Sequence, residues 1–386
     1  MCMFDLLLKG ARVIDPSQNI DGNFDVAFKD GIIAALQPNI PAEQASNTYH
    51  IPGYIVCPGL IDMHSHVYWG GTSAGVDAEP IARRSGTTTF VDAGSSGAGN
   101  FAGFRAHVIE RSAPRILAFL NISFPGIFAF SKSVMVGEAS DVRLVEPRDC
   151  LRVAKENSDL IVGVKARVGA RSSGAMGIGP LHAAIEVADE LGIPVMAHLD
   201  TPAPSRSEVL DTLRPGDILT HCFRGFPNSL VRPDSTIRQG VIEAHERGII
   251  FDIGHGAGGF AFHTARAMLA EGIMPDVISS DVHALCVDGP AHDVLAVMSK
   301  FIALGMPLYE VIRATTQNPA KAINREQLGK LQVGAIGDAA ILKIVNEPYQ
   351  HVDCTGEVLT TNTRLECMGS VIAGHLWNDI KITNAL

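Results

Sequence analysis

Runs of apolar residues alternate with amphipathic stretches through the middle of the chain, over residues 58–325. Several runs are apolar at almost every position, which is typical of parallel strands buried on both faces. The strands expected from these runs cover residues 56–67, 87–94, 115–123, 161–168, 193–200, 218–223, 249–256 and 277–284. Eight strands that alternate with helices predict an α/β fold, a (β/α)8 barrel of the TIM type. A doubly wound open sheet is the competing fold, because it shares this alternation.

The amphipathic stretches between the strands carry helix signals. Apolar residues in 180–191 recur at intervals of three and four, so they share one helix face, and Gly192 with Pro194 beyond it indicates where the helix ends. Residues 291–304 repeat the pattern and are followed by Gly305 and Pro307. Both segments are therefore expected to be helices that cover the strands.

The two ends of the chain have a different pattern, in which short β-type segments are separated by turn residues. Residues 25–36 predict a hairpin that turns at Asp30-Gly31. Glycine-interrupted β-type segments return in 337–345 and 366–375. We expect residues 1–57 and 331–386 to form one small β-sandwich domain beside a barrel of residues 58–330. Two separate edge ribbons would also fit the pattern.

Composition and charge narrow the class of protein. The 386 residues are 46% hydrophobic and 19% charged, which is globular, and the net charge of −10 with no basic cluster argues against a nucleic-acid or membrane-surface partner. Seven widely spaced cysteines without a C-x-x-C pair indicate buried or free thiols in a reducing compartment. The chain shows neither a basic leader nor an apolar stretch of the ~20 residues that a membrane span needs. The expected location is the cytoplasm.

The sharpest chemical signal is the sequence PGLIDMHSH, residues 58–66, at the end of the first expected barrel strand. Residues two apart on a strand share a face, so His64 and His66 would point together, and a pair of imidazoles can bind one metal ion. H-x-H alone is a weak motif, because histidine pairs also occur by chance. Asp62 has the same strand parity, which suits either a hydrogen-bond partner of the two histidines or a turn-side hydrogen bond.

Other polar residues come at or near the C-terminal ends of further expected strands. They are Lys165, His198, His221 and Asp281. Barrel enzymes keep their active sites at this face. One buried histidine is more often a hydrogen-bonded core residue, and one lysine is more often a side chain that reaches solvent. Metal-capable groups at five strand ends are harder to explain by packing, because an unpaired buried polar group is costly.

This set of residues resembles the amidohydrolase superfamily, whose pattern is H-x-H on strand one, Lys on strand four, His on strands five and six, and Asp on strand eight. The segments 315–321 and 334–338 also look like the family's passage into its β domain. Within the superfamily the chain is most similar to the dihydroorotase-like branch. Its closest resemblance there is to deacetylases that act on N-acetyl amino acids or O-acetyl hydroxy acids, notably acetyl-mandelate-type esterases.

The resemblance implies two divalent metal ions, usually Zn²⁺. His64, His66 and Asp281 would hold one ion, and His198 and His221 the other. Lys165 would bridge them as an N6-carboxylysine formed with carbon dioxide. The implied enzyme is a hydrolase that removes an acetyl or other small acyl group from N-acetyl amino acids or acetyl-mandelate-like 2-hydroxy acids. A metal-bridging hydroxide would attack the acyl carbon, and Asp281 would serve as general base and then general acid.

The substrate contacts are assigned more loosely. Arg167 shares a strand face with Lys165, so it could clamp a substrate carboxylate, and a salt-bridged structural arginine is the alternative. His255 ends the seventh strand, where the implied metal set has no ligand, so it is a substrate contact or a structural histidine. Tyr68 and Cys286 are further pocket candidates. The expected partner is the small acylated substrate itself, and a homo-oligomer stays open.

Two short patterns suggest rival functions. Residues 254–259 fit G-x-G-x-x-G, but a dinucleotide site needs this pattern to open a helix at the start of a βαβ unit. Residues 71–75 fit the G-x-S-x-G elbow of serine esterases around Ser73, but the preceding strand ends at His66. A non-catalytic scaffold is a third class, and it is disfavoured because every ligand position is filled. Within the metallohydrolase class, a cyclic amidase of the dihydroorotase or hydantoinase type is the runner-up.

Overall fold

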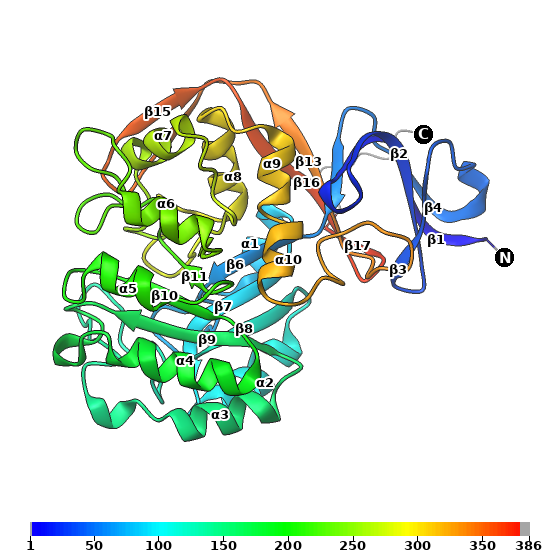
Figure 1. Ribbon diagram of the computed structural model, residues 1–386. Helices are drawn as coiled ribbons and strands as arrows, with labels where there is room; N and C mark the ends of the chain where they lie inside the picture. The colour runs from blue at the N-terminus through cyan, green and yellow to red at the C-terminus, as the bar shows by residue number, and fades with distance from the viewer. Residues whose placement is uncertain (1, 379–386) are drawn as a thin grey trace.

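The computed structural model describes residues 2–378, and its centre is a curved parallel sheet (Figure 1). Seven strands follow one another in the order β12-β11-β10-β9-β8-β7-β6. Their bounds are β6 (Leu60–Ser65), β7 (Thr87–Gly97), β8 (Arg115–Asn121), β9 (Ile161–Val168), β10 (Val195–Leu199), β11 (Ile218–Leu219) and β12 (Ile250–Phe251). The strand order never reverses, so the doubly wound fold does not apply, because its strand order reverses at a switch point.

The eighth expected strand, over 277–284, is not formed as a strand, because its residues make only isolated bridges; residues 277–282 take the eighth position and connect the two edges of this sheet. Val277 pairs with Asp252 beside β12, and Val282 pairs with Ser65 of β6. Backbone hydrogen bonds extend both contacts, from Ile253 N to Val277 O (3.0 Å) and from His66 N to Val282 O (2.9 Å). The sheet and this segment together give the curled, TIM-like barrel that the alternation predicts.

Helices cover the outside of the barrel (Figure 1). The α-helices are α1 (Ala78–Ser85), α2 (Phe101–His107), α3 (Pro147–Glu156), α4 (Gly179–Leu191), α5 (Arg206–Thr212), α6 (Gln239–Glu246), α7 (Phe262–Ala270), α8 (Val294–Ala303), α9 (Leu308–Arg313) and α10 (Gln317–Ala322). α4 ends as predicted, because Gly192 adopts the left-handed conformation that closes a helix. α8 begins later than predicted, because the Asp293 side chain accepts a hydrogen bond from Ala296 N and caps it. Within the described residues, no helix combines the length and hydrophobicity of a membrane span.

A second sheet is built from both ends of the chain, drawn in blue and in orange to red in Figure 1. Its strands are β1 (Phe4–Asp15), β2 (Ile20–Lys29), β3 (Ile32–Gln37), β4 (Ala45–His50), β5 (Ile55–Pro58), β13 (Ala339–Val345), β16 (Arg364–Ile372) and β17 (His375–Asn378). β5 pairs with β13, so the two chain ends share one sheet and do not form separate ribbons. The predicted hairpin is present, because β2 and β3 pair on either side of Asp30-Gly31.

A two-stranded ribbon extends from the terminal sheet over the barrel helices. It consists of β14 (Tyr349–Val352) and β15 (Val358–Thr361), and Figure 1 shows β15 above α7. The turn between the strands contacts the barrel, since Cys354 N donates to Phe260 O (3.2 Å) and Phe262 N donates to Asp353 Oδ2 (2.8 Å). The ribbon therefore ties the terminal domain to the loop that follows β12.

The single strand expected over 56–67 is wrong, because the chain changes sheet inside it. β5 ends at Pro58 in the terminal sheet, and β6 begins at Leu60 in the barrel. A Cβ added to Gly59 would lie only 2.1 Å from Thr88 Oγ1, so only glycine fits at the crossing. Every residue of both strands is buried, and no polar residue marks the break in the sequence.

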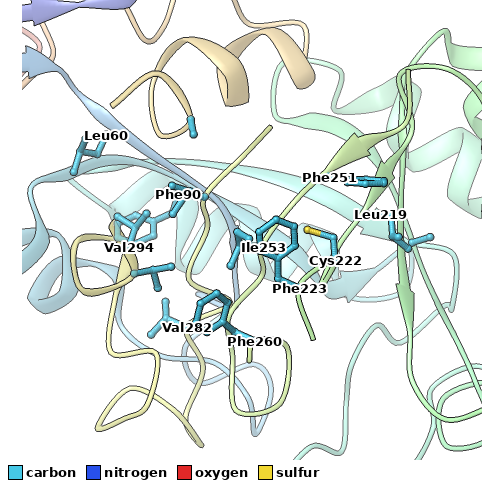
Figure 2. Close-up of a cluster of buried hydrophobic side chains, with 14 of the residues drawn as sticks. Leu60, Phe90, Leu219, Cys222, Phe223, Phe251, Ile253, Phe260, Val282 and Val294 are labelled. Carbon is cyan, nitrogen blue, oxygen red and sulfur yellow. The ribbon is translucent and has the colours of Figure 1, made fainter. Parts of the chain in front are cut away.

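The main hydrophobic core supports the ends of the last barrel strands. Phe223, Phe251, Ile253, Phe260 and Val282 belong to it, and Figure 2 shows Phe223 beside Ile253 near its centre. Rings from the loops after β11 and β12 reach α8, since Phe301 lies 6.1 Å from Phe223 and 5.6 Å from Phe260 between ring centroids. The loops that carry the polar residues described next are thus held on a close-packed layer.

Candidate active site

The predicted metal-binding residues line one small cavity at the C-terminal ends of the barrel strands. They are His64, His66, Lys165, His198, His221 and Asp281. The cavity volume is about 30 Å³, and all six side chains are buried except His198, which is half-buried. The structure thus brings together six residues that are up to 217 positions apart. Their individual roles as metal ligands stay predictions.

His64, His66 and Asp281 lie closest together. Asp281 Oδ1 is 3.3 Å from His64 Nε2 and 3.1 Å from His66 Nε2. One potential ligand atom from each residue lies within 4.8 Å of the other two. Two imidazoles and a carboxylate in a buried group of this size are suited to hold a divalent metal ion.

Hydrogen bonds behind the histidines direct their Nε2 atoms into the cavity. Thr220 donates its hydroxyl proton to Asp252 Oδ2 (2.7 Å), so His64 Nδ1 must donate to Thr220 Oγ1 (2.7 Å). His221 Nδ1 donates to the carbonyl of Gly254 (2.5 Å). In both rings the proton therefore sits on Nδ1, which leaves the Nε2 lone pair free to bind a metal.

His198 supplies a direct test of whether a metal fits. Its Nε2 atom is buried and has no hydrogen-bond partner among the described residues. A buried polar atom without a partner is rare and calls for an explanation such as an ion. The neighbouring imidazole of His221 lies 4.6 Å away between ring centroids. A metal ion bound by these two histidines would satisfy the unpaired nitrogen, so the residues present fit the group that the sequence predicts.

Lys165 lies at the floor of the same cavity. Its Nζ is 3.4 Å from His64 Nε2 and 3.2 Å from Met196 Sδ, and burial lowers its pKa to about 7. Gly94 makes room for the side chain, because a Cβ on Gly94 would lie 2.7 Å from Lys165 Cγ. A substantial fraction of this amine is therefore neutral near pH 7.

Burial also sets the proton affinity of the other groups. It lowers the pKa of His64, His198 and His221 well below the ordinary value, so these imidazoles stay neutral, which is the form that binds metal. Burial raises the pKa of Asp281 to about 6. A carboxyl group with a pKa near neutrality can both accept and donate a proton under ordinary conditions.

Asp62 holds the segment that carries Asp281 against the first barrel strand. Its carboxylate accepts hydrogen bonds from Ser280 N (2.9 Å) and Ser280 Oγ (2.5 Å). Asp281 N in turn donates to His64 O (2.6 Å). These bonds fix Asp281 beside the two histidines of β6, so Asp62 supports the site through Ser280 and is not the hydrogen-bond partner of the two histidines that was expected.

The glycine-rich tract 254–259 lies against the site. It does not open a helix, as a dinucleotide-binding pattern must, because α7 begins only at Phe262. A Cβ on Gly256 would lie 2.2 Å from Asp281 Oδ2, and one on Gly259 would lie 2.5 Å from His221 Nδ1. The glycines allow the backbone to pass directly against the two site residues. The G-x-G-x-x-G pattern therefore reflects close packing around the site.

The structure favours the structural alternative for His255 over the substrate contact. The residue is fully buried, is not among the described residues that line the cavity, and its Nε2 lies 2.7 Å from Lys300 Nζ. Lys300 also donates to Pro290 O and Val352 O, at 2.8 Å each. The buried ammonium of Lys300 needs acceptors, and His255 supplies one of the three. The sequence gives one signal for the partner of His255, which is that Lys300 lies within the otherwise apolar segment 291–304.

A second cavity of about 270 Å³ adjoins the small cavity of the predicted metal-binding residues and shares His198, His221 and Asp281 with it. Its apolar lining comes from Phe130, Met135, Val136 and Leu285, and its cationic lining from Arg167, Arg171 and Arg224. Arg167 faces this cavity as predicted, but its Nη1 also donates to Glu138 Oε2 (3.1 Å) in an ion pair. The cavity can therefore receive a small molecule that has both an apolar and an anionic part.

His283 lines both cavities, although no motif in the sequence singles it out. Its Nδ1 accepts a hydrogen bond from Leu285 N (3.1 Å), so the ring proton must be on Nε2. His283 follows Asp281 by two positions, and this shared parity is the signal that could have found it.

The remaining candidates have structural partners. Ser73 Oγ accepts a hydrogen bond from Phe130 N (2.8 Å), so its partner is a backbone amide and not an imidazole. The Tyr68 ring stacks on Phe104 at 4.5 Å between centroids, and Cys286 Sγ donates to Asp281 O (3.2 Å). Among the described residues, Ser73 thus has no hydrogen-bonded base of the kind that a serine esterase requires.

Comparisons with known proteins agree with this geometry. The model of the amidohydrolase family matches residues 55–225 and 261–369. The chain is 35% identical over 329 residues to Deacetylase Atu3266 of Agrobacterium fabrum, covering 85% of this chain and 80% of that protein. It is 30% identical over 380 residues to a deacetylase of Enterococcus faecalis, covering 97% and 100%.

Two solved structures are similar over almost the whole chain. The crystal structure of an adenine deaminase superposes with a TM-score of 0.90 at 30% identity, covering 97% of this chain and 100% of that one. The crystal structure of a dihydroorotase superposes with a TM-score of 0.87 at 32% identity, covering 97% and 98%.

Proposed function

The chain belongs to the amidohydrolase family, and we propose that within this family it removes an acetyl or other small acyl group from N-acetyl amino acids or O-acetyl 2-hydroxy acids. The observation that carries the proposal is the adjacency of two features. A buried His-His-Asp group lies beside a cavity whose lining is partly apolar and partly arginine. The relatives named deacetylases support the acyl chemistry.

We propose that the site holds two divalent ions, with zinc the first candidate. His64, His66 and Asp281 would hold one ion, and His198 and His221 the other. Lys165 would join them as N6-carboxylysine, since a neutral buried amine can take up carbon dioxide and become an anionic oxygen donor. The unpaired His198 Nε2 and the free Nε2 lone pairs of His64 and His221 support this assignment. When bound, such ions polarise a carbonyl and lower the pKa of a water molecule.

Asp281 is the residue that we propose for proton transfer. Its Oδ1 faces both histidines of β6, and its raised pKa suits a group that changes protonation during turnover. Its carboxylate would accept a proton from the attacking water molecule. It would then deliver this proton to the leaving amine or alkoxide.

Two further groups would orient the substrate. Arg167 is a proposed contact for the substrate carboxylate, on the wall that it shares with Arg224. His283 presents its Nε2–H to the cavities and would donate a hydrogen bond to a substrate oxygen. Phe130 lies over the Arg167 guanidinium, at 5.3 Å from the ring centroid, and would help to exclude water from the reacting group.

A cyclic amidase that opens dihydroorotate or a hydantoin is the second candidate. The similarity to the crystal structure of a dihydroorotase, with a TM-score of 0.87, favours it over a serine esterase and a non-catalytic scaffold. The position of Ser73 gives no support to a serine esterase. A non-catalytic scaffold is disfavoured, because every predicted ligand position is occupied by a suitable residue.

The deciding experiment combines elemental analysis of the purified protein with a panel of acetylated substrates. We expect about two metal ions per chain and hydrolysis of N-acetyl amino acids or O-acetyl 2-hydroxy acids. A chelator should abolish this activity, and added zinc should restore it. Ring-opening of dihydroorotate or a hydantoin without deacetylation would instead support the second candidate.

A further inference from the structure

Arg224 lines the cavity of about 270 Å³, and its guanidinium group contains a buried N–H donor without a hydrogen-bond partner. Arg224 Nη1 donates to Leu199 O, whereas its Nε is buried and has no hydrogen-bond partner among the described residues. Arg167 differs, because it is already paired with Glu138. A buried N–H group without an acceptor costs free energy until an acceptor binds.

The backbone fixes where this guanidinium lies. Arg224 N donates to His221 O (3.1 Å), and Arg224 O accepts from Thr264 Oγ1 (3.0 Å). The side chain then crosses from the loop after β11 to the end of β10, where Leu199 follows His198 directly. Arg224 therefore spans the two strand ends that carry the predicted ligands His198 and His221. An anion bound to Arg224 would lie beside the reacting centre.

Asp200, which also lines this cavity, has its oxygens committed elsewhere. Asp200 Oδ2 accepts hydrogen bonds from Ser172 N (3.0 Å) and Ser172 Oγ (2.7 Å), and Oδ1 accepts from Arg171 N (3.3 Å). Asp200 thus orders the loop after β9 and does not form an ion pair with Arg224. Arg224 therefore lines the cavity as a cation that no carboxylate of the described residues neutralises, and an anion that enters the cavity would complete the pair.

We propose that Arg224 binds the carboxylate of the substrate and thereby determines specificity for acyl compounds with an α-carboxylate. The planar edge of a guanidinium matches the two oxygens of a carboxylate. In an O-acyl 2-hydroxy acid or N-acyl amino acid, the carboxylate is attached to the same carbon as the acyl-bearing oxygen or nitrogen. The location of Arg224 beside His198 and His221 fits this short separation. The inference rests on the proposed function and adds Arg224 to Arg167 as a contact for the substrate carboxylate.

The test compares an anionic and a neutral probe of otherwise similar shape on the metal-loaded, full-length protein. Calorimetry measures the binding of mandelate and of methyl mandelate, and kinetics measure kcat/KM for their O-acetyl derivatives. Arg224→Met should weaken mandelate binding by about 10- to 100-fold, the loss typical of a charge-assisted hydrogen bond, and leave the methyl ester within about twofold. Arg224→Lys should recover part of the loss, because it keeps the charge but not the planar edge.

The matched control is Arg232→Met, which removes the same charge from an exposed position on the same loop. It should leave both probes unchanged, and metal content should equal that of the wild type in every variant. If Arg224→Met does not fold, Arg224→Gln and Arg224→Lys are compared by the same assays. An equal loss for acid and ester, or no loss for either, overturns the proposal. A wild-type protein that hydrolyses no acetylated acid overturns the proposed function as well.

Discussion

The two ends of the barrel use similar residues for different purposes. At the N-terminal ends of the strands, a hollow of about 600 Å³ is lined by Arg214, Asp189 and Asp217, and the arginine is paired with both aspartates. At the C-terminal ends, a cavity of only about 30 Å³ contains His198, whose Nε2 has no partner among the described residues. The predicted metal-binding residues line the smaller cavity, whereas ion pairs line the larger hollow.

The comparison shows that the size of a hollow does not identify the reactive site, because the metal-capable side chains gather at the smaller of the two. Paired charges contribute to stability, whereas unpaired buried donors and acceptors are retained at a cost. Mutations at the C-terminal end should therefore change metal content and turnover. Mutations at the N-terminal end should change the free energy of unfolding and leave turnover unaltered.

The largest effect is expected from Lys165→Ala. A methyl group cannot bridge two ions, so the variant should bind at most one metal ion per chain and lose about a thousandfold or more in kcat. Elemental analysis and steady-state kinetics measure both quantities. A full complement of two ions in Lys165→Ala would remove the bridging role of this residue.

Asp281→Asn should have the second-largest effect. The amide keeps the shape of the side chain but cannot accept the proton, so kcat should fall by about 10²- to 10⁴-fold. At least one metal ion should remain bound, held by the histidines. Turnover close to that of the wild type would show that Asp281 is not the group that transfers the proton.

Arg167→Met should have a smaller and more selective effect. The value of kcat/KM for anionic acetyl esters should fall by about tenfold more than that for neutral esters, because the lost guanidinium interacts mainly with negative charge. The unpaired Glu138, which is buried, should add a general loss for both substrates. An identical effect on anionic and neutral esters would make Arg167 purely structural.

Arg214→Met tests the opposite end of the barrel. Asp217 is buried and would lose the hydrogen bonds from Arg214 Nε (2.9 Å) and Nη2 (2.8 Å). We expect the free energy of unfolding in urea to fall by about 1–3 kcal/mol, with kcat unchanged. A decrease in kcat without a decrease in stability would contradict the division between the two ends.

The smallest expected effect is a pH dependence at His245, whose Nε2 lies 3.4 Å from Asp276 Oδ2 at the N-terminal end. The hydrogen bond to Asp276 raises the pKa of His245 in the folded protein. Its stabilisation is therefore complete below the unfolded-state pKa of about 6.5 and is lost as the pH rises through the folded value. His245→Gln should cost less than about 1 kcal/mol at pH 5.5 and nothing at pH 8.5, as measured by urea unfolding.

The sequence predicts most of the barrel, because the barrel depends on local periodicity, and the resemblance to the amidohydrolase superfamily supplied the set of residues that line the small cavity. Strand parity places His64 with His66, and the apolar runs place Asp281 at a strand end. The sheet change at Gly59 and the hydrogen-bond partner of His255 could not be predicted. The first depends on contact with Thr88, and the second on a partner, Lys300, 45 positions away.

The same limit applies to the substrate cavity. Arg224 looks like an ordinary loop residue in the sequence, because its unpaired Nε follows only from the positions of Leu199 and Asp200. Glu138 likewise acquires its role from a loop that folds back on β9. Contacts of this kind join segments that no sequence period links, so only the folded chain reveals them.

The β14–β15 ribbon limits how this protein can be taken apart. Lys300 uses Val352 O as one of its three acceptors, and Asp353 caps the chain just ahead of α7. A chimaera that exchanges the terminal domain for that of a relative would need to carry the ribbon along with its own sequence. Otherwise the buried ammonium of Lys300 would lose one of its three acceptors beside the loop that carries His255. The two domains are therefore not interchangeable modules.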